Sequence, residues 1–439
     1  MNLTKNSDES IGVHLFVCSW APPIAGGPRN LFNHLKFWPT ERLAYITSYL
    51  NLTWCTLELE TWLNITYEFF EYRGSFSRKQ SRLVVDSAFV RFRFLEKFDV
   101  INEKLKRFVS RHFTSNSSIH LILDIIYQLN RILRVFLACC SYSRRNKISS
   151  VTVVSDMGWG LIGGGLFAIF FSKRLNIFLF DLYADNYLIG GSRYLARFFE
   201  PILFRFAKNV VVTNEVTAEF YLKKYQYLKS IEIVRNSSDL PVQKLNHPIV
   251  KKQDCFTIAF AGRIYWPHFE AIENLLGVMK KLEGKKNILL KVFVIDPTEE
   301  LKEKLLHRVN IEMNYMDRMD LFEAMKEFHL LFVPFGWNTP SQAIIETASP
   351  AKFTDYLATG VPLLVHAPAQ SFVARVTLEK NLGYVVSKNS QEDLLNTILE
   401  AKKMYEQDSF QMGQNCIKYF RDEYLDRLNS DRLWRAVNG

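Results

Sequence analysis

The sequence has few cysteines and lacks the short motifs that common metal sites require. Its six cysteines form no C-x-x-C pair and no zinc-site spacing, which favours a reduced, cytoplasmic compartment. No D-x-D occurs, and the glycine loop at residues 22–30, which follows the first predicted strand, is not G-x-G-x-x-G. We therefore expect neither a metal nor a cofactor to be bound.

Long apolar runs are also missing. The most apolar stretch, from Leu161 to Phe171, ends at Lys173-Arg174 and is shorter than the ~20 residues that a membrane-spanning helix needs. We expect no spanning segment. The cytoplasm, including the inner face of its membrane, is the expected location.

Positive charge is in excess, with 55 Lys and Arg against 45 Asp and Glu and a pI near 9.1. This excess favours an acidic partner such as a phosphorylated substrate or an anionic membrane. A basic, aromatic stretch at residues 90–95 would suit peripheral membrane contact, although a solvated helix face has the same composition. The charge is spread along the chain without a nucleic-acid motif, so no nucleic acid is expected.

Apolar runs that alternate with amphipathic stretches predict an α/β protein with parallel sheets. A chain of 439 residues is long enough for two domains. We place the first domain at residues 11–239, a polar linker at 240–254, the second domain at 255–410, and a C-terminal helical segment at 411–439. In the second domain we expect strands at 256–263, 289–295, 330–335 and 363–365 and a helix at 392–405, followed by a last helix at 411–424.

Polar residues follow several predicted strands of the first domain. Gly26-Gly27 follows the first strand, Asp156 ends the strand at 151–156, and Asp185 comes after the strand at 177–181. The carboxyl ends of parallel strands meet at one edge, where ligands bind. The glycines suit either close approach of a substrate or a plain turn, and each Asp suits either a site or a helix cap.

The stretch from Ser349 to Pro362 has the marks of a helix followed by a buried strand. Ser349 suits the N-cap, Pro350 the first helical position and Gly360 the C-terminal end. The N-terminus of such a helix attracts anions. Lys352 and Asp355 are three residues apart and share a face, which would offer a cation for phosphate and a carboxylate for hydroxyls.

Four stretches together resemble the GT-B glycosyltransferases, particularly the retaining family four. They are Gly26-Gly27, Val234-Arg235-Asn236-x-x-Asp239, Ala261-Gly262-Arg263 and Pro350-x-Lys352-x-x-Asp355-Tyr356-Leu357-Ala358-x-Gly360-x-Pro362. The resemblance implies two Rossmann-like domains facing across a cleft. The acceptor would bind the first domain and the nucleotide sugar the second, with the C-terminal helix crossing back to the first.

The resemblance also implies roles for single residues. Arg263 would contact the donor diphosphate, and Asp355 would bind the ribose hydroxyls. His268 stands where the family has a second diphosphate lysine, so Lys352 would supply the missing charge. Thr347 stands where the family often has a glutamate, so that either Glu346 takes this role or the role is missing.

The first domain would supply the acceptor side of the reaction. Asp185 and Asp156 are the candidates for positioning the acceptor or acting as base. The resemblance implies no committed nucleophile, because the leaving phosphate itself assists the acceptor hydroxyl.

The function expected from these features is transfer of a sugar from a nucleotide sugar to a glycan or lipid-linked acceptor, without a metal. Two alternatives stay open at this point. One is a sugar-nucleotide epimerase of the same fold. The other is a non-catalytic binding or assembly subunit.

Overall fold

The computed structural model of the 439-residue chain describes residues 12–20, 27–48, 66–71, 88–89, 101–102, 104–105, 118–155, 158–241, 255–283, 287–294, 311–314 and 316–439. Two predicted site residues, Gly26 and Asp156, lie outside these ranges. So do the basic stretch at 90–95 and most of the predicted linker.

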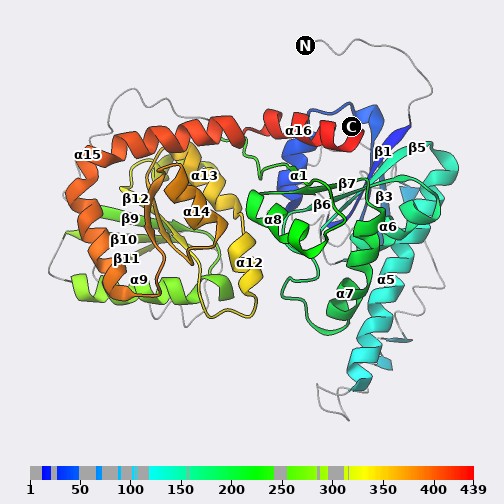
Figure 1. Cartoon of the computed structure of the whole chain (residues 1–439), viewed down its shortest axis with the longest axis horizontal. Helices are drawn as coiled ribbons and strands as arrows, with labels where there is room; N and C mark the ends of the chain where they lie inside the picture. The colour runs from blue at the N-terminus through cyan, green and yellow to red at the C-terminus, as the bar shows by residue number, and fades with distance from the viewer. Residues whose placement is uncertain are drawn as a thin grey trace, which may run out of the picture. The chain divides into compact units, whose positions relative to one another are not determined.

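The described contacts divide the chain into two units. One unit comprises Met1–Thr213, Tyr221–Val234 and Ser430–Gly439, and the other comprises Asn214–Phe220 and Arg235–Asn429. Each unit has its own parallel sheet with helices around it (Figure 1). The predicted α/β class with two Rossmann-like domains is therefore confirmed.

The sheet of the first unit has the strand order β4-β3-β2-β1-β5-β6-β7-β8, and all its described pairs are parallel. Its strands are β1 Val13–Trp20, β2 Leu43–Ser48, β3 Thr66–Glu71, β4 Ala88–Phe89, β5 Ile148–Val154, β6 Arg174–Leu179, β7 Asn209–Val212 and β8 Glu232–Ile233. The helices of this unit are α1 Gly27–Leu35, the short η1 Thr40–Arg42, α5 Ser118–Arg145, α6 Trp159–Phe170 and α7 Gly190–Phe206. Helix α8 Glu215–Lys224 is divided between the two units after Phe220.

Glycine allows α6 to lie close to its neighbours. A Cβ on Gly163 would come within 2.6 Å of the Ile132 carbonyl of α5, and one on Gly164 within 2.9 Å of Val17 in β1. The run Gly163–Gly165 therefore lets one helix pack tightly against both the sheet and α5. These small residues are part of the core and not a binding loop.

The sheet of the second unit has the order β11-β10-β9-β12-β13-β14 and is also parallel. Its strands are β9 Phe256–Ala261, β10 Ile288–Phe293, β11 Ile311–Asn314, β12 Leu330–Pro334, β13 Leu363–His366 and β14 Gly383–Val386. The helices are η3 Trp266–His268, α9 Phe269–Leu282, α11 Arg318–Met325, α12 Gln342–Thr347, α13 Ala351–Thr359, α14 Phe372–Glu379 and α15 Gln391–Glu423. The last helix, α16 Asp426–Asn438, is divided between the two units after Asn429.

Alternation along β9 builds a separate core on each face of this sheet. Ile258 and Phe260 pack in a cluster with α9, whereas Ala259 and Ala261 pack in another with α11, α13 and α14. Successive residues of a strand point to opposite faces, so an apolar strand buried on both faces is expected between two helical layers.

The C-terminal helical segment differs from the prediction in its boundaries. We expected separate helices at 392–405 and 411–424, but α15 runs without interruption from Gln391 to Glu423. The Ser390 hydroxyl caps it by accepting a hydrogen bond from the Asp393 N–H at 3.1 Å, and no proline interrupts the residues between the two predicted helices. Of the segment 411–439, only Ser430–Gly439 groups with the first unit.

These last residues belong to the core of the first unit. Leu433, Ala436 and Val437 are buried in a cluster with Phe16 of β1. The Ala436 carbonyl accepts a hydrogen bond from Asn209 Nδ2 at 2.6 Å, which fixes the end of α16 beside β7.

Candidate functional site

The end of β9 in the second unit brings several predicted site residues together. Gly262, directly after the strand, has φ +124°, a conformation that favours glycine. A Cβ added there would lie 3.8 Å from the side chain of Lys352. The open backbone at Gly262 and the start of α13 therefore meet at one place.

Lys352 lies between an aromatic ring and an imidazole and is partly exposed. Its Nζ lies 4.3 Å from the centroid of the Phe260 ring and 3.5 Å from Nε2 of His268. Burial lowers the pKa of the Lys352 ammonium to about 7. At neutral pH the amine is therefore poised between its charged and neutral forms, and an anion placed beside it would favour the charged one.

His268, in η3, is buried with 3% of its surface exposed. Burial, and then the charge of Lys352, hold the pKa of the imidazole well below its usual range. The ring is therefore neutral at physiological pH and brings no positive charge to a phosphate. Its Nε2 lies 3.5 Å from Lys352 Nζ.

Tyr356 fastens α13 to the end of β9. Its hydroxyl is buried and accepts a hydrogen bond from the Ala261 N–H at 2.7 Å. Because Tyr356 lies one turn beyond Lys352 on the same helix, this bond fixes the distance between the lysine and the strand end. Tyr356 is part of the predicted motif, but its positioning role emerges only from the structure.

Asp355 faces a set of polar partners. Its Oδ1 accepts hydrogen bonds from Ser238 Oγ at 2.9 Å and Arg318 Nη2 at 3.2 Å, and Arg318 Nη1 lies 3.0 Å from Asp239 Oδ1. Burial raises the pKa of the Asp355 carboxyl, and Arg318 opposes that rise. Arg318, the first residue of α11, is a site residue that the sequence analysis missed.

The start of α13 differs by one residue from the prediction. Pro350, extended at ψ 141°, is the residue before the helix, and no side-chain bond from Ser349 caps it. The Ser349 carbonyl instead accepts a hydrogen bond from Asn236 Nδ2 at 2.5 Å, and Thr354 Oγ1 donates to the Asn236 carbonyl at 3.1 Å. The buried Ser349 hydroxyl has no partner among the described residues.

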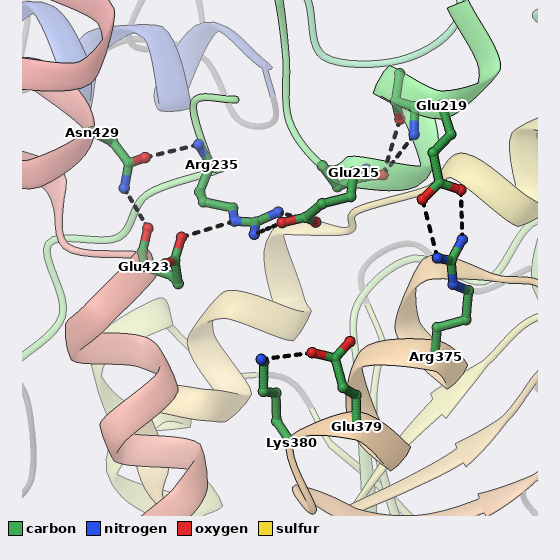
Figure 2. A network of polar contacts seen from close by, with 10 residues as sticks. Glu215, Glu219, Arg235, Arg375, Glu379, Lys380, Glu423 and Asn429 are labelled. Carbon is green, nitrogen blue, oxygen red and sulfur yellow. Dashed lines mark hydrogen bonds and ion pairs between the residues drawn. The ribbon is translucent and has the colours of Figure 1, made fainter. Parts of the chain in front are cut away.

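The segment after β8 is held by a network of polar contacts (Figure 2). The buried Arg235 pairs with Glu215 and with Glu423 Oε2, the latter at 3.3 Å. Its backbone N–H donates to Asn429 Oδ1 at 2.8 Å. A second, more exposed pair joins Arg375 to Glu219 at 2.9 and 3.2 Å. This network anchors the motif Arg235-Asn236-x-x-Asp239.

Residues near the predicted glutamate position have structural partners. The carbonyl of Thr347 accepts hydrogen bonds from Asn214 Nδ2 at 2.8 Å and Thr217 Oγ1 at 3.2 Å, and its hydroxyl donates to the Ala343 carbonyl. Glu346, half-buried on α12, is the carboxylate closest in sequence to this position.

Glu270 of α9 organises the loop that follows β12. Its Oε2 accepts hydrogen bonds from the N–H groups of Trp337 at 2.5 Å and Asn338 at 2.8 Å, and its Oε1 accepts from Asn338 Nδ2. Trp337 Nε1 donates to the Ser387 carbonyl at 3.1 Å.

Arg263, which follows Gly262, is exposed. Among the described residues, no carboxylate forms an ion pair with it.

Two described site residues lie in the first unit. Asp185 pairs with Lys224 Nζ at 2.5 Å, and that ammonium also contacts the fully buried Glu200. Glu200 Oε2 accepts a hydrogen bond from the Ala184 N–H at 2.7 Å, which fixes the loop just before Asp185. Gly27 is the first residue of α1.

Comparison with known proteins gives structural matches only. No protein-family model and no curated sequence matches the chain. HepE of Anabaena, solved with UDP-glucose, matches with a TM-score of 0.62 at 11% identity, over 97% of this chain and 99% of HepE. A glycosyltransferase from Rickettsia africae matches with a TM-score of 0.58 at 12% identity, over 96% of both chains.

A third match is WaaG, a glycosyltransferase involved in lipopolysaccharide biosynthesis. The TM-score is 0.54 at 14% identity, over 97% of this chain and 100% of WaaG. The chain has the GT-B fold. In this fold the cluster around Lys352 lies at the carboxyl end of a parallel sheet, where open α/β sheets bind ligands.

Proposed function

We propose that this protein is a glycosyltransferase that moves a sugar from a nucleotide sugar to a glycan or lipid-linked acceptor, with retention of configuration and without a metal ion. One observation carries the proposal. A buried amine, an open glycine and a carboxylate lie together at the end of β9 and the start of α13, as Lys352, Gly262 and Asp355.

The donor diphosphate would lie against this cluster. Lys352, Arg263 and the backbone N–H groups at the start of α13 would balance its negative charge. Asp355 would accept hydrogen bonds from the ribose hydroxyls, while Arg318 favours its charged form. The loop held by Glu270 would face the sugar.

In the proposed reaction, the bond between the anomeric carbon and the phosphate oxygen breaks, and its electron pair stays on the diphosphate. The acceptor oxygen forms the new bond to the same carbon. The proton of the acceptor hydroxyl passes to an oxygen of the leaving phosphate. Asp185 and Asp156 are proposed to position the acceptor, and Glu346 to contact the donor.

The location proposed is the cytoplasm, at the inner face of the membrane. Among the described residues, no helix is both long and apolar enough to cross a membrane.

A two-stage experiment tests the proposal. The full chain is first screened by thermal shift against nucleotides and nucleotide sugars, beginning with UDP and UDP-glucose because these were bound to HepE. A ligand at 100 times its Kd adds about 2.7 kcal/mol to stability. The best donor is then labelled in the sugar and incubated with lipid-linked and glycan acceptors.

Three variants connect the result to the site. We expect Lys352→Met and Arg263→Ala each to lower turnover by roughly 100-fold, since one donor of this kind is worth about 3 kcal/mol. Asp355→Ala should weaken donor binding. Lys403→Met, at an exposed position of α15, is the matched control. Normal turnover in all three variants would overturn the site, and donor binding without any transfer would favour a binding subunit.

A further inference from the structure

Helix α7 of the first unit presents an exposed face that is both aromatic and basic. Tyr194 and Phe198 are 57% and 64% exposed, and Ile189, directly before the helix, is 72% exposed. Arg193 and Arg197 are exposed on the same helix. A group of neighbouring large apolar side chains that are more than half exposed indicates a binding surface for a partner.

These side chains share one side of the helix. Tyr194 and Phe198 are four residues apart, and so are Arg193 and Arg197, so each pair stacks along the axis. The two pairs are offset by a single residue, or about 100° of rotation. The exposed Pro201 and Arg205 continue the same side toward the C-terminus.

The charge of this face has one sign. Within α7, all of which is described, the one carboxylate is Glu200, which is fully buried and paired with Lys224. Near the start of the helix, Asp124 of α5 is occupied by the Gly191 N–H at 2.7 Å. No carboxylate on the helix therefore balances the exposed arginines.

The uniform positive charge of this face indicates which kind of partner it binds. Two copies of this chain that met through α7 would bring like charges together, which disfavours a symmetric dimer. An anionic lipid surface would bind both the arginines and the aromatic side chains of α7. The arginines pair with headgroup phosphates, and the aromatic side chains enter the membrane interface.

We propose that the exposed face of α7, with Ile189 before it, docks this protein on an anionic membrane. This face does not include residues 90–95, for which the sequence left both membrane contact and a solvated helix face open and which lie outside the described residues. The proposal does not depend on sugar transfer, because docking requires neither donor nor acceptor.

Vesicle sedimentation of the full chain tests the proposal. We expect binding to vesicles made of equal parts phosphatidylglycerol and phosphatidylcholine, and little binding to phosphatidylcholine alone or at high salt. Arg193→Gln with Arg197→Gln should weaken the binding on the order of 30-fold, because each charge near the surface contributes about fivefold. Tyr194→Ser with Phe198→Ser should weaken it as well.

Two controls match these variants. Lys403→Gln with Lys418→Gln removes the same charge from exposed positions of α15, and Leu378→Ser removes an exposed apolar side chain of α14. Both should bind vesicles like the unchanged chain, and all variants should keep the wild-type thermal midpoint. The proposal would be overturned if the control variants lost as much vesicle binding as the α7 variants. It would also be overturned if the α7 variants bound vesicles like the unchanged chain. Self-association that the α7 substitutions abolish, as seen in sedimentation velocity, would overturn it too.

Discussion

The surroundings of Lys352 disfavour the charged form of its amine. Phe260 and a neutral His268 surround the amine, and burial lowers its pKa to about 7. A phosphate bound beside it would restore the pKa toward the value in water, so binding above pH 7 takes up a proton. Near pH 7, binding of an anion therefore changes the protonation state of Lys352, which it would not do for a fully solvated lysine.

This coupling predicts how nucleotide affinity depends on pH. Below about pH 7 the amine is charged before and after binding, so its contribution to the Kd is flat. Above that pH the Kd should rise, approaching tenfold per pH unit, because an unbound neutral amine must first be protonated. Isothermal titration in buffers of different ionisation enthalpy would measure the proton uptake directly.

The Lys352→Arg variant is the control for this pH dependence. Arginine stays charged throughout the range, so the part of the slope that arises from residue 352 should disappear. A slope that persists unchanged in the variant would show that another group is responsible.

Single residues also mark what sequence could and could not predict. Lys352 and Asp355 were expected in one site because they lie three residues apart in one motif, and the structure places Lys352 beside Gly262, the neighbour of the predicted Arg263. Arg318 was missed because it is 37 residues from Asp355 and belongs to no motif. The burial of His268 was likewise not visible, since it depends on Phe260 and Phe335 from other elements.

At the scale of elements, the Tyr356 hydroxyl joins α13 to β9, since it accepts a hydrogen bond from the Ala261 N–H at 2.7 Å and donates to the Ala261 carbonyl at 3.4 Å. Removing the Tyr356 hydroxyl by Tyr356→Phe would leave the Ala261 N–H buried without its acceptor, at a cost of about 1–3 kcal/mol. We expect a lower urea midpoint and a matching loss of donor affinity. Tyr384→Phe, whose hydroxyl makes only a 3.4 Å bond to Asp408, should change neither appreciably.

The polar network of Figure 2 offers a pair of matched arginines. Arg235 is 4% exposed and holds two carboxylates, of Glu215 and Glu423, that are 48% and 26% exposed, whereas Arg375 is 46% exposed and holds one that is 59% exposed. Breaking a buried pair costs about 3 kcal/mol or more, but an exposed pair contributes less than about 1 kcal/mol.

Arg235→Met should therefore destabilise the second unit far more than Arg375→Met. Hydrogen exchange of the β9 and β12 amides, measured at increasing urea concentration, would give the free energy of unfolding of the second unit for both variants. Equal effects would show that burial of Arg235 contributes little to its role.

Elements differ in how far the sequence predicted them. The strands β9, β10, β12 and β13 were predicted to within about two residues, since each is an apolar run bounded by polar residues or glycine. Helix α7 was not predicted, because two glycines precede it and Pro201 lies inside it, both of which indicate a break. The two predicted C-terminal helices proved to be one.

At the scale of the whole molecule, the proposed chemistry relies on protein charges. Because the sequence has no D-x-D, we expect a chelator such as EDTA to leave sugar transfer unchanged. Adding back Mg²⁺ or Mn²⁺ should raise turnover less than twofold. Loss of transfer in the chelator, with recovery on adding a metal, would contradict the metal-free reaction.

The neutral fraction of Lys352 also has a chemical consequence. An uncharged amine is a nucleophile, whereas ordinary lysines near neutral pH are almost entirely protonated. Lys352 should therefore react with an amine-directed acylating reagent well before the exposed lysines of α15, as mass spectrometry of peptides would show. A bound nucleotide should protect it, so the reagent would report on occupancy of the site without any knowledge of the sugar or the acceptor.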